Sequence, residues 1–305
     1  MEQILIIAPN ALSDFVLAVG SMQTVAARHR DARIEILCAP PLRPLAEQLP
    51  GISGLIEDTG KPSAAAALIH RLAAGGYTRI YDLQGGPQTR QYLRLMRWIL
   101  PPGTLMWYRL RGAVGEAPRL LHLQKLRRFG CGSISVSPVN FIPMPADLSF
   151  LHGELDAELA LPERSVLLIP GGGTGSGARW PVEHYAAIAR RLAERGISSL
   201  IIGTKAERES SAAICNAAPG LSLDLSAGVP LTAIPSLARQ SLCSLGHPSG
   251  LASLVALSGA PCLWLTSAIG AAPPGGARTE ILRADATLDT LSVETVWCAL
   301  EPHLA

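Results

Sequence analysis

A glycine-rich segment between an apolar run and a helical pattern has the residue types that hold an anionic ligand. It reads Ile169-Pro-Gly-Gly-Gly-Thr-Gly-Ser-Gly-Ala-Arg-Trp-Pro181. Glycines let backbone N–H groups approach an anion, and the first turn of a helix favours negative charge, so the segment suits a phosphate group. Its spacing fits neither a Walker A loop nor GxGxxG, and a surface loop is the alternative. The candidate ligand-binding residues are Gly171, Gly172, Gly173, Thr174 and Arg179.

A second loop, from Leu245 to Leu251, also joins an apolar run to a helical pattern. Ser249 and the N–H groups near Gly250 would meet a phosphate or a sugar, although an ordinary helix N-cap has the same residues. His247 could contact phosphate or act as an acid, but a single loop histidine is more often a bystander. The loop lacks the Gly-x-Ser-x-Gly pattern of a nucleophile elbow, which argues against a hydrolase.

Both loops need parallel strands to position them, and short apolar runs do alternate with helical patterns along the chain. This β-α-β-α order predicts parallel strands with right-handed crossovers. A proline-rich stretch, 133–150, interrupts it. We therefore expect two domains, 1–150 and 151–290, and a C-terminal helix, 291–305, that could pack back on the first. The expected strands are 4–8, 34–38, 54–56, 79–83, 165–169, 198–202, 242–245 and 262–265. The expected helices include 13–29 with Ser13 as its cap, 63–74, 88–100, 118–129, 181–195 and 207–217.

The composition is that of a globular protein with no strong charge bias. Of 305 residues, 48% are hydrophobic and 16% are charged, and the net charge is +2. This argues against disorder and against a nucleic-acid partner. The six cysteines are scattered without CxxC or metal-ligand spacing, so we expect reduced thiols and no metal site. No apolar run reaches the roughly 20 residues of a membrane span, and the first residues resemble a strand rather than a signal peptide. We expect a cytoplasmic protein.

Basic residues gather between 90 and 128, where Glu116 is the single acidic residue. Such a patch suits a phosphorylated or carboxylated ligand, with Arg90, Arg94 and Arg119 as candidate contacts. It also suits peripheral contact with the anionic cytoplasmic face of an inner membrane. The alternative is a solvated helix face above core aromatic residues.

The order of these motifs resembles that of glycosyltransferase family 9, the ADP-heptose:lipopolysaccharide heptosyltransferases. The resemblance rests on Ala11-Leu-Ser-Asp14, Tyr81-Asp-Leu-Gln-Gly85, Pro170-Gly-Gly-Gly173 with Arg179-Trp-Pro181, and Gly246–Pro261. It implies a GT-B fold, with two facing Rossmann-like domains that have parallel sheets. It also implies inverting transfer of heptose or a related sugar from ADP-heptose to a lipopolysaccharide core or similar acidic glycolipid, without a metal or other cofactor.

The resemblance also suggests roles for single residues. Asp14 matches the family's candidate general base, which takes a proton from the acceptor hydroxyl; the alternative is that it only favours the helix N-terminus. The glycines after Pro170 match the turn that holds the donor diphosphate, and Ser249 with Gly250 match a loop on the donor phosphate or sugar. Glu207 lies near the acidic position that often holds the ribose.

Three departures from the family pattern fall on the donor side. Ala178 stands where the family has lysine, Pro248 where it has aspartate and Ser253 where it has histidine. The lost lysine would offset the charge of the leaving diphosphate, and one such contact contributes about 3 kcal/mol. A weakly active or inactive relative that binds nucleotide sugars, or acts as a scaffold in envelope-glycan assembly, is therefore the second hypothesis. A dehydrogenase or epimerase is disfavoured because GxGxxG and its acidic partner are missing.

Overall fold

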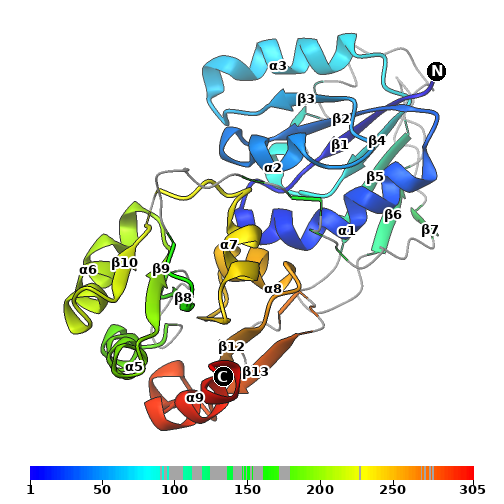
Figure 1. Ribbon diagram of the computed structural model, residues 1–305. Helices are drawn as coiled ribbons and strands as arrows, with labels where there is room; N and C mark the ends of the chain where they lie inside the picture. Colours follow the sequence, from blue (N-terminus) through cyan, green and yellow to red (C-terminus); the bar gives the residue numbers. More distant parts are fainter. Residues whose placement is uncertain are drawn as a thin grey trace. The chain divides into compact units, whose positions relative to one another are not determined.

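The chain forms two compact units, Met1–Ala146 and Asp147–Ala305, each built on one sheet (Figure 1). The sequence analysis placed the boundary four residues later, at 150. The computed structural model describes residues 1–89, 91–92, 95, 106–111, 119–123, 136–139, 146, 148, 150–151, 153, 161–171, 179–226, 228–268, 270, 273–274, 276 and 278–305. For the strands between 106 and 139, only the backbone is considered below.

The first unit begins as a β/α repeat whose strands run parallel. The strand order across the sheet is β3-β2-β1-β4-β5-β6-β7, so β1 and β4 are neighbours although two strands separate them in sequence. The expected strands in this half are confirmed to within a residue or two. The elements are β1 (Gln3–Ile7), α1 (Leu12–Arg28), β2 (Arg33–Cys38), the 3-10 turn η1 (Pro40–Leu42), α2 (Arg43–Glu47), β3 (Gly54–Glu57), α3 (Pro62–Ala74), β4 (Arg79–Asp82), β5 (Met106–Arg111), β6 (Arg119–Leu123) and β7 (Val136–Val139).

The last three strands of this sheet correct the sequence analysis. A helix was expected at 118–129 and a linker or domain edge at 133–150, but β6 pairs antiparallel with β5, and β7 pairs antiparallel with β6. A short run rich in leucine fits a helix and a strand equally well, so periodicity cannot decide between them. The hydrogen-bonding edge offered by β5 decides in favour of a strand.

Helices α1 and α3 lie on opposite faces of the first sheet (Figure 1). Leu5 and Ile7 of β1 pack in one buried cluster with Leu68 and Leu72 of α3. The N-cap of α1 is Ala11, in extended conformation (φ −86°, ψ 138°) with no side-chain cap bond, so Ser13 does not cap the helix as expected. The helix begins two residues earlier because the Phe15 N–H donates to the Ala11 carbonyl.

The second unit has a sheet in which all strands run parallel, in the order β10-β9-β8-β11-β12-β13. Strands β10 and β13 escaped sequence analysis because they lie at the edges and expose much of their length. The elements are β8 (Ser165–Ile169), α5 (Val182–Glu194), β9 (Ser198–Ile201), η2 (Lys205–Glu207), α6 (Arg208–Ala217), β10 (Ser222–Asp224), α7 (Ile234–Gln240), β11 (Cys243–Gly246), α8 (Gly250–Ala256), β12 (Cys262–Thr266), β13 (Thr279–Arg283), η3 (Leu288–Thr290), α9 (Val293–Leu300) and η4 (Glu301–His303).

Helix α9 packs within the second unit, and the packing on the first unit that the sequence analysis allowed stays a prediction. Trp297 and Leu300 belong to the buried cluster that α5 forms with the sheet. The guanidinium carbons of Arg191 and Arg195 on α5 lie 5.6 and 4.8 Å from the Trp297 ring centroid. The apolar side of a short amphipathic helix is thus covered by its own unit.

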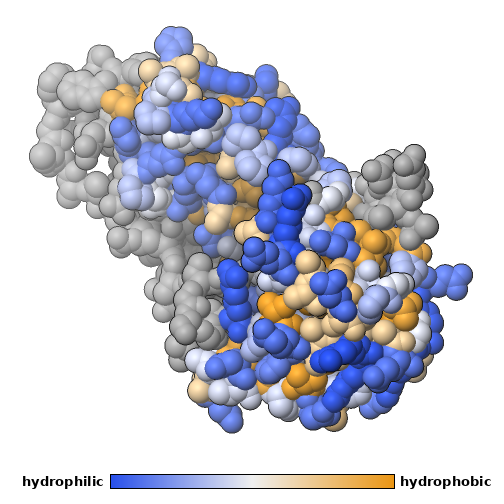
Figure 2. All heavy atoms as spheres, turned by 90° about the vertical axis from the view of Figure 1, so that its left-hand side faces the viewer, coloured by the Kyte–Doolittle hydropathy of each residue, from blue (hydrophilic) through white to orange (hydrophobic). Residues whose placement is uncertain are grey.

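The outer surface of the second unit mixes polar and apolar side chains. Figure 2 shows hydrophilic side chains spread over the visible face, with hydrophobic ones in small groups between them. Within the part of the chain that the structure describes, no helix has the length and apolar character needed to cross a membrane.

Candidate functional site

The second sheet reverses its strand order at β8, which lies between β9 and β11. In open α/β sheets, ligands bind at the carboxyl ends of the strands at such a switch point, because the loops on either side diverge. The loop after β8 begins Pro170-Gly171, the loop after β9 contains Thr204, and the loop after β11 contains Ser249. The topology therefore brings the two loops singled out from sequence to one edge, together with a third.

Glu207 lies where the loops after β8 and β9 meet, and its residue is 7% exposed. Its Oε2 accepts hydrogen bonds from the Thr204 N–H (2.8 Å) and the Thr204 hydroxyl (2.5 Å). The Thr204 Oγ1 accepts from the Ala206 N–H at 3.2 Å, which completes a capping box around η2. The carboxylate is therefore fixed to the end of β9 rather than left to swing in solvent.

Gly171 is buried against this acid, and the contact explains why a glycine stands there. A Cβ built on Gly171 would lie 2.6 Å from Glu207 Cγ and 3.1 Å from its Oε1. On the other side, a Cβ on Gly203 would lie 3.0 Å from Glu207 Cβ. The two glycines thus make room for one acidic side chain between the ends of β8 and β9.

A pocket of about 260 Å³ opens beside this acid at the same edge of the sheet. Its lining is mainly apolar, and Thr204 and Lys205 at its rim are polar and exposed. Sequence analysis did not find this pocket, because its walls come from five separate segments. The lining residues are Ile202, Gly203, Thr204, Lys205, Leu225, Val229, Leu231, Ile234 and Leu251.

Ser249 is the N-cap of α8 and Gly250 is its first residue. The Ser249 hydroxyl accepts a hydrogen bond from the Ala252 N–H at 3.1 Å, so this side chain acts as an ordinary helix N-cap. The Ser253 hydroxyl donates to the Ser249 carbonyl at 2.9 Å. At the family's histidine position this chain therefore has a group that stabilises its own helix.

His247 is fully buried between the carboxyl ends of β8 and β11. Its Nδ1 lies 3.1 Å from the Tyr185 hydroxyl, which also donates to the Ile169 carbonyl at 3.2 Å. Burial raises the pKa of the Tyr185 phenol, so this hydroxyl stays protonated at neutral pH. The histidine is enclosed in the protein rather than presented to a ligand, and sequence analysis gave no sign of its tyrosine partner.

The far end of the glycine-rich segment is anchored in the core. Trp180 is 1% exposed, its indole N–H donates to the Leu291 carbonyl at 2.8 Å, and its ring contacts Tyr185 edge to face at 4.8 Å. Pro181 is the N-cap of α5, so the helix begins at Val182, one residue later than expected. Arg179 is exposed. Gly172, Gly173, Thr174 and Ala178 lie outside the described residues, so their predicted roles stay predictions.

The first sheet has its own switch point, between β1 and β4. Asp14 is exposed in the first turn of α1, which follows β1. Asp82 ends β4 and is fully buried, and its Oδ1 accepts from the Gly85 N–H at 2.8 Å, which closes a turn with Gly85 at φ +63°. The register pairs Ile7 with Asp82, so the loop that bears Asp14 and the 82–85 turn leave neighbouring strand ends.

The basic residues expected to contact an acidic ligand are Arg90, Arg94 and Arg119. Arg90 and Arg94 lie outside the described residues, and Arg119 lies on β6 opposite Arg111 of β5. Among the described residues, no group of three or more His, Cys, Asp and Glu side chains is arranged to hold a metal ion.

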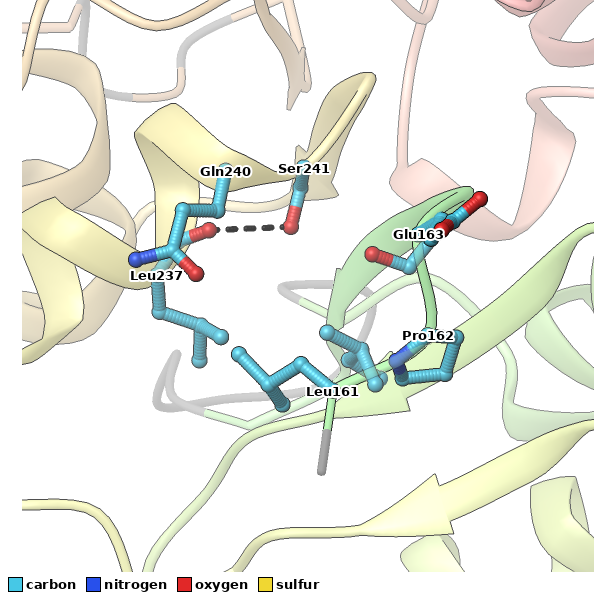
Figure 3. A pocket seen from close by; sticks show the side chains of 8 residues that line it. Leu161, Pro162, Glu163, Leu237, Gln240 and Ser241 are labelled. Atoms are coloured by element: carbon cyan, nitrogen blue, oxygen red, sulfur yellow. Dashed lines mark hydrogen bonds between the residues drawn. The ribbon is translucent and has the colours of Figure 1, made fainter. Parts of the chain in front are cut away.

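Another cavity, of about 270 Å³, lies at the opposite, amino edge of the second sheet. Figure 3 shows Leu237, Gln240 and Ser241, at the end of α7, facing the segment Leu161–Glu163 that leads into β8. The Ser241 hydroxyl donates a hydrogen bond to the Leu237 carbonyl at 3.0 Å. This cavity is separate from the loops at the switch point, so it does not belong to the candidate site.

Solved structures match the whole chain in fold. E. coli ADP-heptose LPS heptosyltransferase II aligns over 100% of this chain and 98% of its own, with a TM-score of 0.72 and 18% identity. A family 9 glycosyltransferase from Veillonella parvula aligns over 99% of this chain and 97% of its own, with a TM-score of 0.73 and 15% identity. E. coli heptosyltransferase WaaC with ADP aligns over 99% of both chains, with a TM-score of 0.69 and 13% identity.

These neighbours are GT-B glycosyltransferases, so the predicted fold class is confirmed, and the resemblance to family 9 holds at the level of the fold. No protein-family model matches the sequence, and no curated protein matches it significantly. At such low identity the fold alone is shared, and activity has to be argued from the site.

Proposed function

We propose that this protein is an inverting glycosyltransferase that moves heptose, or a related sugar, from ADP-heptose to an acidic glycolipid such as a lipopolysaccharide core. The observation that carries this proposal is the buried Glu207, held by Thr204 and packed on Gly171 beside an apolar pocket at the switch point. This is the arrangement that a nucleotide needs, because base, ribose and phosphates prefer an apolar pocket, a carboxylate and glycine-rich backbone, respectively.

In the proposed complex, the pocket beside η2 takes the base. The Oε1 of Glu207 lies on the Gly171 side and accepts hydrogen bonds from the ribose hydroxyls, while Oε2 keeps its bonds to Thr204. The diphosphate then extends towards the loops after β8 and β11, where the backbone N–H groups near Gly171 and Gly250 offset its charge. The proposal of an ADP donor is supported by the similarity in fold to E. coli heptosyltransferase WaaC, whose structure was determined with ADP.

In the proposed reaction, an acceptor hydroxyl attacks the anomeric carbon as the bond to the diphosphate oxygen breaks. The hydroxyl proton passes to Asp14, which is exposed at the start of α1, and the nucleoside diphosphate leaves with the bonding electrons. Inversion, metal independence and the candidate acceptor contacts Arg90, Arg94 and Arg119 are parts of the same proposal. Peripheral contact with the cytoplasmic face of the inner membrane would bring the enzyme to its acceptor.

The test is a transfer assay with purified protein, ADP-heptose and a lipopolysaccharide core acceptor, run beside the same assay with Asp14→Asn. We expect turnover by the unaltered chain and a loss of about 100-fold or more in kcat for the variant, because general-base catalysis contributes that much. ADP affinity should stay unchanged, since Asp14 is assigned to the acceptor side. Equal turnover by both proteins would remove Asp14 from the mechanism.

A second candidate function is nucleotide-sugar binding without turnover, for example as a scaffold in envelope-glycan assembly. It is favoured by Ser253, whose hydroxyl bonds to the Ser249 carbonyl where the family pattern has histidine. Calorimetry with a panel of ADP-, UDP- and GDP-sugars separates the two functions. Tight ADP-heptose binding with no transfer to any core acceptor would favour this second function, whereas binding with transfer would favour the enzyme.

A further inference from the structure

Tyr185 and His247 form a buried hydrogen-bonded pair directly beneath two loops of the candidate site. Both residues are fully buried. Tyr185 extends from α5 to the carboxyl edge of the sheet, where its hydroxyl contacts the Ile169 carbonyl at 3.2 Å and His247 Nδ1 at 3.1 Å. Ile169 directly precedes Pro170-Gly171, and His247 lies two residues before Ser249. One hydroxyl therefore connects the loop after β8 to the loop after β11.

The chemistry of the three groups fixes the direction of both hydrogen bonds. A carbonyl oxygen can only accept, so the single proton of the Tyr185 hydroxyl is donated to Ile169. The phenol oxygen is then left as an acceptor, and His247 Nδ1 must carry a proton and donate it. The contact consequently requires a proton on Nδ1 of the imidazole.

The strand ends that these bonds connect are already close together. Gly246 pairs with Ile169 in the register, and a Cβ built on Gly246 would lie only 2.9 Å from Ile169 Cβ. The Tyr185 ring is itself held by its edge-to-face contact with Trp180. A rigid ring that bonds to both strand ends limits the separate movement of the two loops that follow them.

We infer that Tyr185 and His247 are positioning residues that hold the loops after β8 and β11 in one geometry for the donor diphosphate. The identity of the ligand rests on the proposed function, whereas the restraint on the two loops does not depend on that function. An asparagine side chain at position 247 would place an amide N–H donor close to the position of Nδ1. Either side chain can donate to the same phenol oxygen.

The first test measures ADP affinity by calorimetry for Tyr185→Phe, His247→Leu and His247→Asn. Tyr185→Phe keeps the ring and removes the hydroxyl, so we expect about fivefold weaker binding, the equivalent of one net hydrogen bond. His247→Leu should weaken binding at least as much, and His247→Asn should restore most of the affinity. Tyr77→Phe is the matched control, since it removes a phenol hydroxyl bonded to Glu35 in the first unit and should leave affinity unchanged.

The second test needs no ligand and measures amide hydrogen exchange at Gly171 and at Ser249–Leu251. Tyr185→Phe should speed exchange at both places by about fivefold or more, while Tyr77→Phe should not. Faster exchange in a protein that fails to bind ADP would support the restraint and refute the proposed function. Unchanged exchange at both places, or faster exchange throughout the unit, would overturn the inference. If the unaltered protein binds ADP, an affinity of His247→Asn as low as that of His247→Leu would overturn it too.

Discussion

The two sheets of this protein have their switch points in equivalent places but present different chemistry there. Between β8 and β11, and extending to β9, the second unit has a buried acid, two glycines that approach it closely, and an apolar pocket of about 260 Å³. Between β1 and β4, the first unit has an exposed carboxylate at Asp14 and a buried one at Asp82 that closes its own turn. One edge thus combines a pocket with a buried acidic side chain, and the other exposes the Asp14 carboxylate to solvent.

In the proposed function, this difference assigns donor binding to the second unit and proton transfer to the first. Glu207 cannot easily move, because its Oε2 already accepts two hydrogen bonds from Thr204, so it is suited to recognise a ligand. Asp14 is exposed in the first turn of α1, where the proposed reaction needs a carboxylate to take a proton. The predictions that follow test whether donor binding belongs to the second edge alone.

The largest effect is expected at Gly171. Gly171→Ala would place a methyl group 2.6 Å from Glu207 Cγ, and overpacking of a buried site costs about 1–3 kcal/mol. We expect at least tenfold weaker ADP binding by calorimetry and a lower unfolding temperature. The matched change in the first unit is Gly86→Ala, where the nearest side-chain atoms would lie 3.9 Å away. If Gly86→Ala weakened ADP binding as much as Gly171→Ala, the proposed division between the edges would be wrong.

A smaller effect is expected for Glu207→Gln, which keeps the shape of the side chain and removes its charge. Its hydrogen bonds to Thr204 weaken, which should cost about 1 kcal/mol of unfolding free energy, and ribose binding should weaken by up to about tenfold. Glu209→Gln, on the exposed side of α6, is the control. Denaturant unfolding and ADP titration measure the two quantities. An ADP affinity equal to that of the control would rule out Glu207 as the ribose ligand.

Tyr92→Phe, in the first unit, is expected to have no effect on donor binding. The Tyr92 hydroxyl donates to Asp58 at 2.6 Å, so its loss should lower the free energy of unfolding by about 1 kcal/mol. Burial, followed by this bond, raises the pKa of Tyr92 above its ordinary value of about 10. The stability that the hydroxyl confers should therefore be fully present at neutral pH and decline as pH rises above about 10. Weaker ADP binding by this variant would contradict the comparison.

Sequence alone predicted the repeated β/α units and the loops of the second switch point, because buried parallel strands such as Ser165–Ile169 are continuous apolar runs with clear ends. The edge strands β10 and β13 and the antiparallel strands β6 and β7 escaped it, because their stability comes from partners distant in sequence. Glu207 was found through a loose family alignment, although Thr204-x-x-Glu207 is a capping-box pattern that could have been recognised directly.

The pocket and the tyrosine–histidine pair could not be predicted in the same way. The pocket exists only where the loops after β9 and β10 meet the first turns of α7 and α8. Tyr185 occupies a buried position of an amphipathic helix, where sequence patterns indicate only packing. Its hydroxyl reaches the strand ends at Ile169 and His247 only because of where α5 packs along the strands, and the sequence does not indicate that position.

The position of Trp180 makes the second unit its own optical probe. This indole ends the glycine-rich segment, bonds to the Leu291 carbonyl ahead of α9 and contacts Tyr185. Indole emission depends on the dipoles and rings around it, so a shift of the loop after β8 would alter the fluorescence of a residue already in place. Because the chain has five tryptophans, a variant that keeps Trp180 alone would record the occupancy of the site and the packing of the C-terminal segment in one spectrum, without a label.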